Sequence, residues 1–89
     1  MKGKLLSIIK YFGINEQLVK LHEEVGELTV ECIKDDYFNI VEELADVTTL
    51  LKQIQYFFEI DDQEIEIMMN DKVNRTLKRI KEGYYDEHR

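Results

Sequence analysis

Apolar residues recur at intervals of three and four along nearly the whole chain, and no proline interrupts them. That interval places apolar side chains on one face of an α-helix, whereas a half-buried strand alternates with a period of two. Proline disrupts a helix interior but is common in turns. Because the chain has 89 residues, we expect long helices packed into a single domain over residues 1–89.

Four helices are expected, at about residues 5–12, 16–34, 38–59 and 62–82. Gly13 suits the position after a helix, and Asn15 is a plausible N-cap for the second helix. Asp36, with the aspartate before it, breaks the pattern and caps the third helix. Asp61 and Glu64 have the spacing of a capping box at the start of the fourth helix. Short connections between helices predict an all-α, antiparallel four-helix bundle.

The two middle helices have wide apolar faces. On the second helix the face consists of Leu18, Leu21, Val25, Leu28 and Cys32, and on the third of Ile40, Leu44, Val47, Leu51, Ile54 and Phe58. These residues are expected in the core, with Cys32 as an inert core thiol. Because the chain is short, it is not expected to cover both apolar faces by itself. A homodimer or homotetramer is therefore predicted.

Composition excludes several classes of protein. The formal net charge of -7 argues against a protein that binds nucleic acid or an anionic membrane, because such a protein carries an excess of basic residues on its binding surface. No apolar run approaches the ~18 residues of a membrane span. The single cysteine forms no intrachain disulfide, which favours a reducing cytoplasm.

Acidic residues cluster on the two middle helices at positions that a plain solvated face does not explain. On the second helix, Glu24 flanks the apolar stripe and Glu27 continues it. On the third, Glu43 lies about 60° from the centre of the apolar arc and Asp46 at its edge, with Glu42 on the opposite side. Packing the two apolar faces together therefore draws these carboxylates, except that of Glu42, toward the core.

Carboxylates near a core are tolerated when they are protonated, paired or bound to metal. Oxygen ligands suit a hard divalent cation, so Mg²⁺ is expected, with Mn²⁺ as a substitute. On the fourth helix Lys72, Arg75 and Arg79 form a basic stripe. Carboxylates with metal on one side and basic side chains on the other are typical of a polyphosphate site.

The motifs Glu23-Glu24-Val-Gly-Glu27 and Glu43-Leu-Ala-Asp46 resemble the EExxE…ExxD signature of MazG-like nucleotide pyrophosphohydrolases. These enzymes belong to the all-α NTP pyrophosphatase superfamily, which includes dimeric dUTPases and phosphoribosyl-ATP pyrophosphohydrolases. The resemblance runs from about Gln17 to Arg79. It implies Mg²⁺-dependent hydrolysis of a nucleoside triphosphate to the monophosphate and pyrophosphate.

The resemblance also implies roles for single residues. Glu24, Glu27, Glu43 and Asp46 match the family's metal ligands, the same four carboxylates that the helical wheel selects. Glu23 matches an acid assigned to the second shell or to water activation, so Glu23 and Glu24 are the catalytic candidates. The candidate phosphate-binding residues are Lys72, Arg75, Arg79 and Lys20.

Other interpretations remain open. The acidic clusters also suit a non-catalytic helical interaction module with a solvated acidic face, or a dUTPase or phosphoribosyl-ATP pyrophosphohydrolase of the same fold. Glu31 is expected to be either a solvated acid or an acid that lies behind the metal ligands. Aromatic residues are expected in the core or an interface, with a nucleobase pocket as the alternative for Tyr11, Phe12, Tyr37, Phe57 and Phe58.

Overall fold

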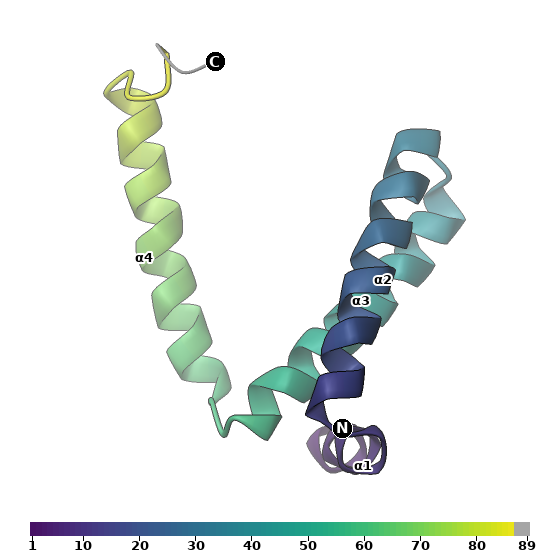
Figure 1. Cartoon of the computed structure of the whole chain (residues 1–89). Coiled ribbons are helices and arrows are strands. Elements are labelled where there is room, and N and C mark those ends of the chain that lie inside the picture. The colour runs from purple at the N-terminus through teal and green to yellow at the C-terminus, as the bar shows by residue number, and fades with distance from the viewer. Residues whose placement is uncertain (87–89) are drawn as a thin grey trace. The chain divides into compact units, whose positions relative to one another are not determined.

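A computed structural model describes residues 1–86, which form α-helices and no strand (Figure 1). The helices are α1 (Lys2–Phe12), α2 (Ile14–Lys34), α3 (Tyr37–Phe57) and α4 (Asp62–Lys81). The all-α class and the four predicted helices are thereby confirmed. None of the described helices is long and apolar enough to cross a membrane. The chain divides into two compact units, of which the first contains α1 to α3 and the second contains α4.

Helices α2 and α3 form an antiparallel hairpin joined by two aspartates. Asp35 ends α2 in the left-handed conformation, with φ 59°, and its N–H donates to the Cys32 carbonyl at 3.1 Å. Asp36 begins α3, and its carboxylate accepts a hydrogen bond from the Asn39 N–H at 3.2 Å. The predicted break at this position is confirmed. Because the connection is so short, α2 and α3 lie side by side along their length (Figure 1).

Helix α1 packs against both α2 and α3 and completes the small apolar core of the first unit. The buried apolar side chains are Leu5, Ile9, Val47 and Leu50. Gly13 joins α1 to α2 with a φ of 90°, a backbone angle that residues with a side chain rarely adopt. The prediction that Asn15 caps α2 is wrong, because α2 begins at Ile14 directly after this glycine and no side chain caps it.

Part of each predicted apolar face is uncovered in the single chain. Leu18, Val25, Leu44, Leu51 and Phe58 are between 42% and 58% exposed. Cys32 is exposed as well, so its predicted place in the core is wrong for the single chain. Each hairpin helix turns only one side of its wide face toward its neighbours, where Leu21 and Leu28 are half-buried and Val47 is buried. The other side has no cover within the unit.

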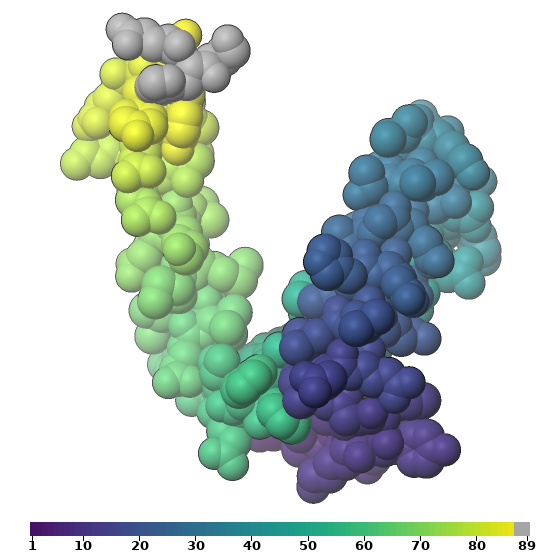
Figure 2. Space-filling model, in the orientation of Figure 1, coloured from purple at the N-terminus to yellow at the C-terminus, as the bar shows by residue number. Residues whose placement is uncertain are grey.

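Helix α4 begins at the predicted capping box. The Glu64 N–H donates to Asp61 Oδ1 at 2.9 Å, and the Asp61 N–H donates to Glu64 Oε2 at 3.1 Å. A lone helix has nothing within itself against which to bury an apolar face, and α4 has no buried residue. Figure 2 shows α4 in green to yellow, with its side chains at the surface. Its apolar stripe is between 36% and 58% exposed and consists of Ile65, Met69, Val73, Leu77 and Ile80.

Candidate functional site

Three carboxylates from the hairpin gather at one place. Glu24 and Glu27 lie one turn apart on α2, and Glu43 lies on α3; one carboxylate oxygen from each lies within 4.8 Å of the other two. Glu24 and Glu43 are half-buried, whereas Glu27 is exposed. Oxygens that share one Mg²⁺ at ~2.1 Å are at most about 4.2 Å apart. Small side-chain rotations therefore bring all three within reach of one cation.

The cluster contains oxygens that lack any partner. Glu24 Oε2 and Glu43 Oε2 are buried without a hydrogen bond. Among residues 1–86, none of the three clustered acids forms an ion pair with a basic side chain. A buried, unpaired carboxylate oxygen is costly unless a cation or a proton compensates it. The donor set, all carboxylate oxygens, therefore fits a hard divalent cation.

The electrostatics of the cluster act most strongly on Glu43. Its pKa is raised from 4.5 to about 7, first by a hydrogen bond that the protonated carboxyl makes with Glu24 and then by desolvation. The negative charges of Glu24, Glu27 and Asp46 raise the pKa further. A carboxyl that holds its proton near neutral pH marks a site where negative charge is concentrated. A bound cation would displace this proton.

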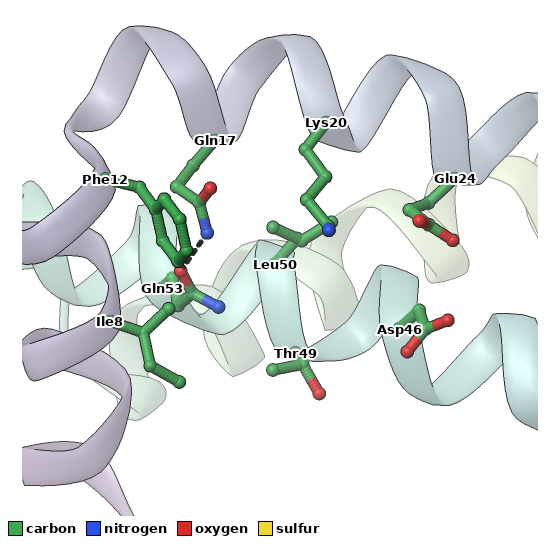
Figure 3. A pocket seen from close by; sticks show the side chains of 9 residues that line it. All are labelled: Ile8, Phe12, Gln17, Lys20, Glu24, Asp46, Thr49, Leu50 and Gln53. Carbon is green, nitrogen blue, oxygen red and sulfur yellow. Dashed lines mark hydrogen bonds between the residues drawn. The ribbon is translucent and has the colours of Figure 1, made fainter.

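The other predicted acids surround the three clustered carboxylates. Asp46 is exposed and is not a member of the close group, although its charge contributes to the raised pKa of Glu43. Figure 3 shows Asp46 and Glu24 on facing sides of the two helices. Glu23 is exposed and borders an open groove with Glu27 and Glu43. The four predicted ligands therefore differ in burial. Glu24 and Glu43 are half-buried, whereas Glu27 and Asp46 are exposed.

Of the two alternatives expected for Glu31, the fully solvated acid is wrong, because the side chain is half-buried. It borders the same groove as Glu27, and its Oε2 atom is buried without a hydrogen bond. Its Oε1 atom lies 3.9 Å from Lys34 Nζ. Glu31 continues the stripe of Glu24 and Glu27 along α2.

A pocket of about 210 Å³ includes Glu24, one of the clustered acids, in its lining (Figure 3). Its lining combines apolar side chains, two amides, one cation and two of the acids. The lining residues are Ile8, Phe12, Gln17, Lys20, Glu24, Asp46, Thr49, Leu50 and Gln53. The predicted phosphate-binding Lys20 is thus beside the candidate metal ligands, between them and the amides.

The two glutamines of this pocket are absent from the sequence-based prediction. Gln17 and Gln53 are 3% and 2% exposed, and Gln17 Nε2 donates to Gln53 Oε1 at 2.7 Å. A signal for them exists in the sequence. Gln17, Lys20 and Glu24 follow one another at spacings of three and four, which puts all three on the face of α2 that meets α3.

The basic residues of α4 belong to the second unit. Lys72 and Arg75 are exposed. The Arg79 guanidinium carbon lies 5.0 Å from the centre of the Tyr84 ring, a cation–π distance. Lys72 borders a shallow surface hollow with Val73, Thr76 and Leu77. These cations lie along one side of α4.

No family model, curated protein or solved structure matches the chain.

Proposed function

We propose that the protein is an Mg²⁺-dependent nucleoside triphosphate pyrophosphohydrolase of the MazG-like type. It hydrolyses ribo- or deoxyribonucleoside triphosphates to the monophosphate and pyrophosphate. The observation that supports this proposal most strongly is the meeting of Glu24, Glu27 and Glu43, with buried oxygens that have no partner among the described residues. Such an arrangement is hard to explain as a solvated acidic face, because two of the three acids are half-buried.

The chain supplies distinct groups for each part of this reaction. Glu24, Glu27 and Glu43 hold the cation, and Asp46 completes the ligand set from one turn away on α3. When bound, Mg²⁺ neutralises phosphate charge and lowers the pKa of a coordinated water. Glu23 borders the groove beside Glu27 and Glu43, where its exposed carboxylate accepts the proton of the attacking water.

Basic side chains neutralise the departing phosphates. Lys20 lines the pocket beside Glu24 and Asp46, and it contacts a phosphate near the sugar. Lys72, Arg75 and Arg79 on α4 remain the further candidate phosphate-binding residues. A guanidinium forms two parallel hydrogen bonds with phosphate oxygens, which makes arginine suited to this role.

Incubation of the purified protein with Mg²⁺ and a panel of ribo- and deoxyribonucleoside triphosphates is expected to release pyrophosphate and the matching monophosphate. Chromatography of the nucleotide products and an enzymatic pyrophosphate assay check this result. Excess EDTA is the matched control and is expected to stop the reaction, and Mn²⁺ is expected to restore it. Release of orthophosphate alone, or of nothing from any substrate, would contradict the proposal.

We further propose that the protein works as a homodimer or homotetramer. The apolar stripe of α4 and the uncovered sides of α2 and α3 are too extensive for a stable isolated chain. A second copy presents equally uncovered apolar faces. Burial of such a face stabilises a complex by roughly 25 cal/mol per Å² of apolar surface, before the cost of association.

Val73→Glu on the α4 stripe is expected to shift the assembly toward monomers, because it places a charge in the apolar contact. Light scattering coupled to size-exclusion chromatography measures the mass. Met68→Glu is the matched control, since Met68 is an equally exposed apolar residue (56%, against 53% for Val73) that lies about 140° away from Val73 around α4. A wild-type protein that is monomeric at micromolar concentration, or equal effects of both variants, would rule out this interface.

A further inference from the structure

We infer that Gln17 and Gln53 are positioning residues. Their hydrogen bond fixes how far α2 and α3 are displaced along each other, and this alignment brings the three clustered carboxylates together. The inference rests on the proposed function, because the carboxylates that the pair aligns are the proposed metal ligands. Neither glutamine belongs to the motifs that predict the metal site.

Apolar packing alone defines the alignment of the two helices weakly. Of residues 14–34, which form α2, only Gln17 is buried. The apolar side chains that α2 turns toward α3, Leu21 and Leu28, are half-buried, and the attraction between apolar side chains is non-directional. Because Leu28 repeats Leu21 two turns later, a displaced α2 would make similar apolar contacts.

The contact between the two amides is directional, which the contacts of the leucines are not. Gln17 Nε2 donates to Gln53 Oε1 at 2.7 Å, and the two side chains are 3% and 2% exposed. Displacement of α2 by one turn, about 5.4 Å, would break this bond and leave two buried amides without their partners. Each such amide disfavours the displaced alignment by roughly 5–150-fold. A buried asparagine specifies the alignment of coiled-coil helices for the same reason.

The amide pair and the acids lie on the same sides of the two helices. Gln17 precedes Glu24 by seven positions on α2, and Asp46 precedes Gln53 by seven positions on α3. Seven residues make almost two full turns and a rise of about 10 Å. Figure 3 shows both levels, with the bond between the amides at one and Glu24 facing Asp46 at the other. The amides are therefore too distant to be metal ligands and act on the site through the helices.

The carboxylates tolerate little displacement of one helix along the other. One oxygen from each of Glu24, Glu27 and Glu43 lies within 4.8 Å of the other two. Mg²⁺ requires near-ideal octahedral geometry with ligands at about 2.0–2.1 Å. A displacement of one turn exceeds the present separation of these oxygens, so it would carry Glu43 away from its two partners on α2. The alignment that satisfies the amides is therefore also the one that suits a cation.

A double substitution separates the positioning role from stability. Gln17→Met and Gln53→Met each leave one buried amide without its partner, so each single variant is expected to lower the equilibrium constant of folding by about tenfold. The double variant replaces both amides with apolar side chains of similar length and is expected to recover this loss. Its Mn²⁺ affinity is nevertheless expected to fall by about tenfold, because only the molecules in the binding alignment take up the ion. Urea melts in EDTA and calorimetric titration with Mn²⁺ measure the two effects.

Gln55→Met is the matched control, because Gln55 is also buried on α3 but lies outside the pair. Its Mn²⁺ affinity is expected to change by less than about twofold, as for a site that is not coupled to the acids. A double variant that regains stability and binds Mn²⁺ like the wild type would refute this inference alone. A wild-type protein that binds no Mn²⁺ would refute the proposed function and this inference with it.

If the double variant does not fold, the wild-type protein decides the question. Coupling between two sites is reciprocal, so a cation that needs this alignment also holds the amides together. Mg²⁺ is expected to slow solvent exchange of the Gln17 side-chain hydrogens, measured by NMR, more than that of the Gln55 side-chain hydrogens. Equal slowing at both glutamines would reflect general stabilisation of the fold and would overturn the inference.

Discussion

Glu43→Gln is expected to lower pyrophosphate release by roughly 10²–10³-fold while leaving the helical content unchanged. Glutamine has nearly the same shape as glutamate but lacks the charge that holds the cation. Loss of several kcal/mol of charge stabilisation in the transition state corresponds to a rate loss of this size. Because Glu43 faces Glu24 and Glu27, the same substitution also relieves repulsion. The metal-free variant is therefore expected to be at least as stable as the wild type.

Glu42→Gln is the matched control. Glu42 is the preceding acid on α3, is exposed and lies outside the cluster, so its removal is expected to change activity by less than about twofold. Steady-state rates and circular dichroism melts of both variants provide the comparison. Equal activity of Glu43→Gln and wild type would show that the acidic cluster is not a catalytic site.

In the metal-free protein, the free energy of unfolding is expected to fall as the pH rises from about 5 to about 8. The pKa of Glu43 in the folded chain is about 7, above its ordinary value of 4.5. The folded state therefore binds this proton more tightly than the unfolded state does. The resulting stabilisation is complete below about pH 4.5 and is lost as the pH rises through about 7. Thermal or urea melts in EDTA across this range measure the effect.

Mg²⁺ is expected to reverse this loss at pH 8. A cation that binds only the folded state at about 100 times its dissociation constant stabilises it by about 2.7 kcal/mol. For a domain of this size, that stabilisation corresponds to an increase of about 10–20 °C in Tm. Glu43→Gln is expected to show a flatter pH dependence without metal and a much smaller response to Mg²⁺. An identical pH profile in wild type and variant would refute the role assigned to Glu43.

The helices could be predicted closely because their signals are local. Asp36 and Asp61 are N-caps whose side chains accept hydrogen bonds from the N–H groups three residues ahead, and the sequence contains that spacing directly. The error at Asn15 has a local cause as well. Gly13 adopts φ 90° and ends one helix while it begins the next, so no room remains for a separate capping residue.

The acids of the candidate site could be predicted because adjoining helices bring their apolar faces together and carry the flanking carboxylates with them. Gln17 and Gln53 could not be recognised in the same way. Their importance comes from a contact between positions 36 residues apart, and neither residue type marks a metal site. The exposure of Leu44, Leu51 and Cys32 follows from a property that composition does not reveal, namely which side of each helix finds a neighbour within one chain.

The two-aspartate turn between α2 and α3 lies midway along the sequence between the paired residues of the site. Measured along the sequence from Asp35, the partners are equidistant: Glu27 and Glu43 are each eight positions away, and Gln17 and Gln53 are each eighteen away. One residue inserted within α3 before Glu43 would rotate the side chains that follow it by about 100° around the helix and separate the acids and the amides from their partners on α2. The number of helical residues between the turn and each of these side chains therefore sets the register of the whole site.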